Sequence, residues 1–223
     1  MKINFKVDCD QKKVLNSKKW TKWIRNLNLH FFVKEINVYK VDMFGDKVGF
    51  IYVEVDCTDL NNNPVPGLAL IRGDSVSILT VIKNTDDNKE YVVFTEQCRV
   101  PSGKILLESP AGMIDEGNIL SVAIEELKEE VGFDIFEKSN LTKLSGGYSS
   151  PGGIDEYVDI FAYELFLNTK QINDLNNKVT GNVNENEIIK LKIFPFNLAI
   201  NFTESLITKL AILEYKRINN EQI

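Results

Sequence analysis

Four glutamates fall within six residues of this sequence: Glu125, Glu126, Glu129 and Glu130. At about 100° per residue, the last three would share one flank of a helix. Each like-charge neighbour three or four residues away costs about 0.2–0.5 kcal/mol, so this pattern needs an offsetting partner unless it is a solvated acidic face. Carboxylate oxygens are the hard ligands that Mg²⁺ and Mn²⁺ prefer. The pattern alone therefore leaves two interpretations open, a solvated surface and a divalent metal site.

The residues before the cluster favour the metal site. Gly112 and Gly117 lie in the run AGMIDEG, where two glycines permit a tight backbone turn. The segment from Glu108 to Phe133 is therefore predicted to be a strand end, a loop and a helix. The helix would pack through apolar residues at helical spacing, namely Leu120, Ala123, Ile124, Leu127 and Val131.

Gly112 together with EELKEEVGF, residues 125–133, resembles the Nudix box, the signature of hydrolases that act on nucleoside diphosphates linked to another group. The sequence departs from that pattern in three ways. Asn118 stands where a Glu is expected, Glu125 stands where an Arg is expected, and the spacing between them is one residue shorter. If the missing Glu and Arg normally support each other as an ion pair, their joint loss is consistent with a compensated variant.

The resemblance implies roles for the residues that match. Glu126, Glu129 and Glu130 would be catalytic metal ligands, with the Ala111 carbonyl as a fourth contact. Gly112 would lie at the substrate. The implied cofactor is Mg²⁺, with Mn²⁺ possible.

The run YSSPGGIDE, residues 148–156, contains the Ser, Pro and Gly residues that are typical of an ordinary turn. After a Nudix-like box it resembles the S-P-G-G-x-x-E loop of the ADP-sugar and ADP-ribose pyrophosphatase branch, in which the closing Glu activates water. The resemblance makes Glu156 the candidate general base, with Asp155 as the alternative. Metal-bound carboxylates are poor bases because the cation lowers their pKa, so a carboxylate outside the metal cluster suits this role.

Two arginines are candidates for substrate binding, because guanidinium groups pair with phosphate oxygens through two hydrogen bonds. Arg99 and Arg72 lie in runs similar to the E-Q-x-R and R-G pieces of ADP-sugar pyrophosphatases. The resemblance implies that Arg99 contacts the phosphates and that Arg72 lies near the nucleobase. The alternative for both arginines is that they are solvated residues at strand ends. Matches to the plant-type ADP-sugar pyrophosphatases run from about residue 17 to the end of the chain.

Composition narrows the protein class. The 223 residues carry a net charge of −6 and show no basic block that would follow a nucleic-acid backbone, so we expect no nucleic-acid partner. Three cysteines without C-x-x-C spacing argue against a zinc site and a disulfide framework. With no apolar run long enough to span a membrane and no signal-like start, we expect a soluble, cytoplasmic protein. His30, in an apolar neighbourhood, is expected to be structural.

Hydrophobic periodicity predicts two domains. Residues 1–70 would form a β-rich N-terminal unit, with an amphipathic helix over 17–27, capped by Ser17, and a hairpin of strands 34–42 and 47–57. Residues 71–223 would form the hydrolase domain. Further strands are predicted at 76–82, 91–96, 105–107, 143–144, 157–167 and 187–194, and a final helix over 203–217 with Leu206, Leu210, Leu213 and Ile218 inward.

These elements predict an α/β fold, an α/β/α sandwich with a mixed sheet, and the Nudix resemblance implies the same fold. The expected function is Mg²⁺-dependent hydrolysis of an ADP-sugar, ADP-ribose or ADP-glucose, to AMP and a sugar phosphate. The alternatives are a Nudix-fold sensor that binds a nucleotide sugar without hydrolysing it, and a UDP-sugar pyrophosphatase. The N-terminal unit is too small to bury its own faces, and the resemblance implies a homodimer formed through it.

Overall fold

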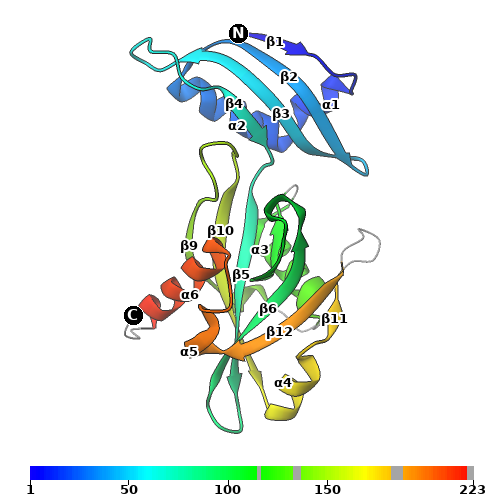
Figure 1. The fold of residues 1–223 in the computed structure, drawn as a ribbon, viewed down its shortest axis with the longest axis vertical. Helices are drawn as coiled ribbons and strands as arrows, with labels where there is room; N and C mark the ends of the chain where they lie inside the picture. The colour runs from blue at the N-terminus through cyan, green and yellow to red at the C-terminus, as the bar shows by residue number, and fades with distance from the viewer. Residues whose placement is uncertain (115–116, 133–136, 182–187, 220–223) are drawn as a thin grey trace. The chain divides into compact units, whose positions relative to one another are not determined.

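The computed structural model describes residues 1–114, 117–132, 137–181 and 188–219, and the chain forms two compact units (Figure 1). The first unit consists of Met1–Asp74 and Tyr148–Tyr157. The second consists of Ser75–Gly147 and Val158–Ile223. The first unit ends at Asp74, and a later segment of the chain, Tyr148–Tyr157, returns to it. None of the helices in the described ranges is long and apolar enough to cross a membrane.

The first unit is a four-stranded sheet in the order β1-β2-β3-β4 with two helices. β1 pairs with β2 in parallel, and the other neighbours are antiparallel. The elements are β1 (Lys2–Phe5), α1 (Gln11–Asn16), α2 (Lys18–His30), β2 (Phe32–Phe44), β3 (Lys47–Thr58) and β4 (Leu68–Ile71). The predicted helix and hairpin are therefore present, whereas β1 and α1 were not predicted.

One face of this sheet is buried and the other is exposed. Along β3, Ile51, Val53 and Val55 are buried, while Tyr52 and Glu54 between them are exposed, as the alternation of a strand requires. The buried side chains share one core with Trp20 of α2. The α2 helix begins as predicted, because the Ser17 side chain accepts a hydrogen bond from the Trp20 N–H.

The segment Tyr148–Tyr157 joins the first unit along β4. The Leu70 N–H donates to the Gly153 carbonyl at 2.8 Å, and Leu70 forms an isolated parallel bridge with Ile154. This segment leaves the second unit at the end of one strand and returns at the start of the next. Backbone hydrogen bonds therefore fix the loop that carries Asp155 and Glu156 to the first unit.

The second unit is built on an eight-stranded mixed sheet. Its main path runs β11-β12-β6-β5-β10-β9, with β7 paired to β6 and β8 paired to β5. Its strands are β5 (Ser75–Asn84), β6 (Glu90–Arg99), β7 (Lys104–Glu108), β8 (Ala111–Met113), β9 (Leu141–Tyr148), β10 (Tyr157–Leu167), β11 (Val179–Thr180) and β12 (Ile189–Pro195). Its helices and helical turns are η1 (Val100–Ser102), α3 (Ile119–Glu126), η2 (Leu127–Val131), η3 (Lys138–Asn140), α4 (Thr169–Leu175), α5 (Phe196–Ala199) and α6 (Leu206–Ile218).

Helices cover both faces of this sheet. One core contains side chains of α3, η2 and α4, and the other contains side chains of α5 and α6. This arrangement is the predicted α/β/α sandwich (Figure 1). The α6 helix forms where expected, but its predicted inner face is wrong: Leu206 is 76% exposed and Ile218 is 40% exposed. The residues of α6 that are buried are Thr208, Ala211, Ile212 and Tyr215.

Candidate active site

The acidic cluster lies where α3 passes into the π-helical turn η2. Asn118, at the position where the Nudix pattern has a Glu, caps α3 by accepting a hydrogen bond from the Leu120 N–H at 2.8 Å. The helix ends at Gly132, whose φ of +80° is the left-handed conformation that glycine adopts without strain. A π-turn widens the helix locally and changes the direction of the side chains that follow, and such turns are frequent at functional sites.

Glu130 is turned into the protein by this geometry. Its residue is 1% exposed, and its two carboxylate oxygens accept hydrogen bonds from the Ala111 N–H at 3.0 Å and from Gln97 Nε2 at 3.1 Å. Ala111 lies in β8 and Gln97 lies in β6, so the carboxylate links the helix to two strands. A buried carboxylate needs such donors because its desolvation is costly.

Glu126 occupies the space that Gly112 leaves by lacking a side chain. A Cβ atom at Gly112 would lie 1.8 Å from Glu126 Oε1, a distance at which two atoms cannot coexist. Only glycine at position 112 therefore allows the Glu126 carboxylate to approach the backbone this closely. Glu125 and Glu129 are both exposed.

These carboxylates have the chemistry of a site for a hard divalent cation, and Glu126 lies against strand β8 at Gly112, where the resemblance places the substrate. They are directed to different neighbours, however. Among the residues that the structure describes, no three His, Cys, Asp or Glu side chains form a ready-made metal cluster. Asp115 and Glu116 of the same loop lie outside the described residues. The resemblance implies Glu126, Glu129, Glu130 and the Ala111 carbonyl as metal ligands, and the structure joins two of these residues, since the Ala111 N–H donates to the Glu130 carboxylate.

Arg99 is the last residue of β6 and forms an ion pair with Glu108 of β7, with 2.6 Å between Arg99 Nε and a carboxylate oxygen. Arg99 lies at the turn between the antiparallel neighbours β6 and β7, opposite Lys104, and Glu108 lies at the far end of β7, opposite Thr95. The Arg99 side chain is 41% exposed, which leaves part of its guanidinium accessible to a ligand.

Glu156 and Arg72 lie together in the first unit. Arg72 Nε is 3.1 Å from one carboxylate oxygen of Glu156, and the other oxygen accepts a hydrogen bond from Ser149 Oγ at 2.8 Å. The Arg72 guanidinium also lies over the Phe50 ring, 5.6 Å from its centroid. Glu156 is thus oriented by two polar side chains.

Asp155, the alternative base, has a structural contact instead. Its Oδ1 accepts hydrogen bonds from the backbone N–H groups of Arg72 at 2.6 Å and Gly73 at 3.1 Å. Burial raises the pKa of this carboxyl above its ordinary value, an effect that the two backbone hydrogen bonds partly oppose. Asp155 therefore fastens the loop to the end of β4.

The structure brings the sequence-predicted residues into two groups, each within one unit. Gly112 with Glu126, and Ala111 with Glu130, meet in the second unit, and Arg72 meets Glu156 in the first. Sequence reasoning missed Gln97, Glu108 and Ser149, the partners of Glu130, Arg99 and Glu156. Gln97 lies in the E-Q-x-R run and Ser149 lies in the run YSSPGGIDE, so membership of these motifs could have identified both residues.

Comparisons with known proteins agree on one family. Residues 72–212 match the model of the NUDIX domain. Nudix hydrolase 14, chloroplastic, from Arabidopsis thaliana is 34% identical over 207 residues, covering 84% of this chain and 66% of the relative. The ADP-ribose pyrophosphatase of Bacillus subtilis (strain 168) is 31% identical over 134 residues, covering 59% of this chain and 67% of the relative. The chain thus spans about two thirds of the length of each of these relatives.

A solved structure shows a similar fold. The crystal structure of an ADP compounds hydrolase superposes with a TM-score of 0.57 and covers 85% of this chain and 96% of that chain. Its sequence identity is 18%, so the likeness concerns the fold.

Proposed function

Because this chain belongs to the NUDIX domain family, we propose that it hydrolyses the diphosphate of an ADP-sugar, such as ADP-ribose or ADP-glucose, to AMP and a sugar phosphate. Water would attack one phosphorus, and the bond between that phosphorus and the bridging oxygen would break. The observation that carries the proposal is the close approach of Glu126 to the backbone at Gly112, beside the buried Glu130. The names of the two curated relatives, a Nudix hydrolase and an ADP-ribose pyrophosphatase, support the same reaction.

The helix carboxylates Glu126, Glu129 and Glu130 would hold the divalent metal, Mg²⁺ or Mn²⁺. When bound, a divalent cation neutralises phosphate charge and lowers the pKa of attacking water. The protein contributes position. The hydrogen bonds from the Ala111 N–H and from Gln97 fix the Glu130 carboxylate, and the glycine at position 112 admits Glu126 close to the backbone.

Glu156 would take the proton from the attacking water. It lies outside the helix cluster, and a carboxylate that holds no metal is the better base. Ser149 Oγ and Arg72 Nε orient its two oxygens in the absence of substrate. The neighbouring Gly152 and Gly153 permit the loop to change conformation on binding.

The two arginines would bind substrate. Arg99, partly exposed at the end of β6, suits the diphosphate, because guanidinium groups pair with phosphate oxygens. Arg72, whose guanidinium lies over the Phe50 ring, suits a flat nucleobase, because guanidinium groups stack on aromatic faces. In this assignment the ion pair between Arg72 and the Glu156 carboxylate breaks, or Arg72 contacts both Glu156 and the nucleobase, when substrate binds.

A homodimer formed through the first unit is part of this proposal. The sheet face opposite the shared core exposes large apolar side chains: Tyr39 at 42%, Tyr52 at 40% and Leu68 at 58%. Exposed apolar surface of this kind favours an interface. We expect a closed two-fold pair of about 50 kDa, twice the chain mass of 25.4 kDa, by light scattering at micromolar concentration. A monomer there would contradict it. The proposed compartment is the cytoplasm.

The test is a substrate panel assayed for both products. Purified protein with Mg²⁺ is mixed with ADP-ribose, ADP-glucose or UDP-glucose, and nucleoside monophosphate and sugar phosphate are measured together. We expect AMP from one of the two ADP-sugars. Faster release of UMP from UDP-glucose would show that the preferred nucleobase is uracil and would replace the ADP-sugar by a UDP-sugar as the substrate. Calorimetric binding without any product would identify a nucleotide-sugar sensor and overturn the hydrolase proposal.

A further inference from the structure

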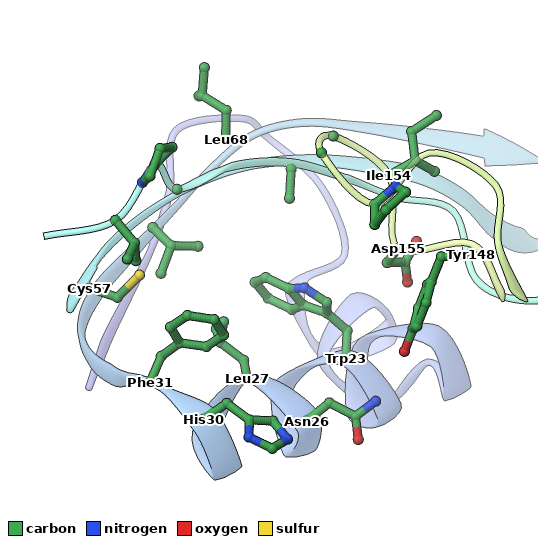
Figure 2. A pocket seen from close by; sticks show the side chains of 18 of the residues that line it. Trp23, Asn26, Leu27, His30, Phe31, Cys57, Leu68, Tyr148, Ile154 and Asp155 are labelled. Atoms are coloured by element: carbon green, nitrogen blue, oxygen red, sulfur yellow. The ribbon is translucent and has the colours of Figure 1, made fainter. Parts of the chain in front are cut away.

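The first unit contains a cavity of about 570 Å³ that the proposed reaction does not use. It lies between α2, the strands β3 and β4, and the loop from Tyr148 to Asp155 (Figure 2). Small-molecule pockets are roughly 300–1,000 Å³, so this one has the size for a single organic ligand. Arg72 and Glu156 are not among the residues that line it.

The walls of this cavity are aromatic and aliphatic. Trp23 and Leu27, four residues apart on one face of α2, line it together with Phe31, the residue that follows the helix. Figure 2 shows these side chains between α2 and the strands, with Cys57 of β3 at the left of the view. A flat ring placed here would contact Trp23 and Phe31, and aromatic pairs gain about 0.5–1.5 kcal/mol beyond their area burial.

The charged groups along the cavity already have partners. The Lys22 ammonium pairs with the Asp74 carboxylate, and the Asp155 carboxylate accepts the backbone N–H groups of Arg72 and Gly73. Burial, with a contribution from the Asp56 charge, raises the pKa of the Cys57 thiol, which keeps it uncharged near neutral pH. Asn26 and His30 of α2 also line the cavity and carry groups that can form hydrogen bonds (Figure 2). The lining therefore favours an uncharged ligand.

One wall of the cavity is the loop that ends at Glu156. Gly152, Gly153, Ile154 and Asp155 all line it. This wall is held on β4 by the hydrogen bond from the Leu70 N–H to the Gly153 carbonyl. A ligand packed against it would hold the loop in the described arrangement, with Glu156 on Arg72 and Ser149.

We propose that this cavity is an effector site for an uncharged, flat, mostly apolar molecule, and that its occupation lowers turnover by holding the Glu156 loop on β4. The binding half of the proposal rests on the cavity alone. The effect on turnover rests also on the proposed function, because it needs Glu156 to be the base.

Binding is tested with a matched pair of fluorescent probes on the full chain. N-phenyl-1-naphthylamine is uncharged, and 8-anilinonaphthalene-1-sulfonate is the same ring system with a sulfonate. We expect the uncharged probe to saturate at one per chain, to reduce the combined emission of Trp20 and Trp23, whose ring centroids lie 5.3 Å apart, and to bind at least ~10-fold more tightly than the sulfonate. Equal or tighter binding of the sulfonate would overturn the assignment of ligand class, and no saturable binding would overturn the site.

Variants locate the bound probe. Cys57→Phe fills the cavity and should abolish binding, and Cys57→Leu is a smaller filling change that should weaken it if the larger one does not fold. Leu29→Phe is the control, because Leu29 lies on the same helix, is 65% exposed and does not line the cavity. It should bind the probe as the parent chain does. Unchanged binding in both Cys57 variants would place the probe elsewhere and overturn the site.

Turnover of an ADP-sugar is then measured with saturating uncharged probe. We expect kcat to fall at least ~3-fold with KM unchanged, in the parent chain and in Leu29→Phe but not in Cys57→Leu. Binding without any fall in kcat would overturn the coupling to the Glu156 loop. A rise in KM alone would make the cavity part of the substrate site. If the chain binds the probe but hydrolyses none of the substrates in the panel, the cavity is still a binding site, and the proposed hydrolase function is wrong.

A second copy of the chain is the competing occupant. Light scattering of the probe-saturated protein checks this, and we expect an unchanged mass. If the probe splits a dimer into single chains, the cavity belongs to the contact between copies and the effector proposal is wrong.

Discussion

Arg72 Nε lies 3.1 Å from one oxygen of the Glu156 carboxylate, and Ser149 Oγ holds the other oxygen at 2.8 Å. All three residues belong to the first unit, with Arg72 after β4 and the other two in the returning loop. Glu156 is therefore oriented before any substrate is present. A carboxylate in this arrangement becomes a base for water only when one of its two contacts is released or shared.

The variant Asp155→Asn tests whether Glu156 or its neighbour Asp155 is the general base. Asparagine keeps an oxygen that accepts the Arg72 and Gly73 N–H groups, so the loop should stay in place. If Glu156 is the base, kcat should remain within ~3-fold of the parent value. A loss of turnover comparable to that of a base mutation would instead make Asp155 the base.

The same variant has a stability signature that depends on pH. The folded pKa of Asp155 is raised by burial, so the folded state binds the proton more tightly than the unfolded state does. Ionisation therefore costs stability, and that cost appears as pH rises from the unfolded pKa of about 3.9 through the folded one. We expect Asp155→Asn to melt a few degrees above the parent at pH 7, with the difference shrinking towards pH 4. A difference that grows on acidification would contradict this.

The helix carboxylates are tested by Glu130→Gln, which removes a charge with little change in shape. We expect at least a ~100-fold loss of kcat, because a metal held by few carboxylates suffers from losing one. The fold should survive, since a glutamine oxygen still accepts the Ala111 N–H. Circular dichroism and turnover are measured side by side.

Glu125→Gln is the matched control for that experiment. It removes an adjacent charge from the same helix at an exposed position, and kcat should stay within ~2-fold. Near-normal turnover of Glu130→Gln would remove Glu130 from the active site. Equal losses in the two variants would show that general acidity of this surface is what matters.

The close approach at Gly112 predicts the effect of a single methyl group. In Gly112→Ala the new Cβ would lie 1.8 Å from Glu126 Oε1, so the Glu126 side chain or the backbone must move. We expect a ~10- to 100-fold lower kcat. Gly147→Ala is the control, because a Cβ at Gly147 meets nothing within 4 Å. If both variants turn over alike, the position of Glu126 is unimportant for catalysis.

Local patterns identified most elements, and their limits are visible at particular residues. Ser17 caps α2 as predicted, and β10 spans the predicted residues 157–167, because capping and alternation are local signals. The inner face of α6 was misread because leucine occurs on both of its sides. Contact with the sheet, rather than hydrophobicity, buries Thr208 and exposes Leu206.

Contacts between distant parts of the chain could not be predicted from local patterns. The bridge between Leu70 and Ile154 joins residues far apart in sequence and brings the loop of Glu156 into the first unit. The π-turn at η2 occurs together with the inward contacts of Glu130 with Ala111 and Gln97, and periodicity contains neither feature. Motif resemblance named Glu130 and Glu156, whereas the side chains that orient them came from the structure.

The most direct test of the account is Glu156→Gln, assayed on the ADP-sugar that the parent chain hydrolyses with Mg²⁺. We expect kcat to fall by about 100- to 10,000-fold, while calorimetric affinities for metal and for substrate stay close to parent values, because only proton removal from water is lost. Unchanged turnover, or a loss of metal affinity that parallels the loss of rate, would contradict the role of Glu156 as the base.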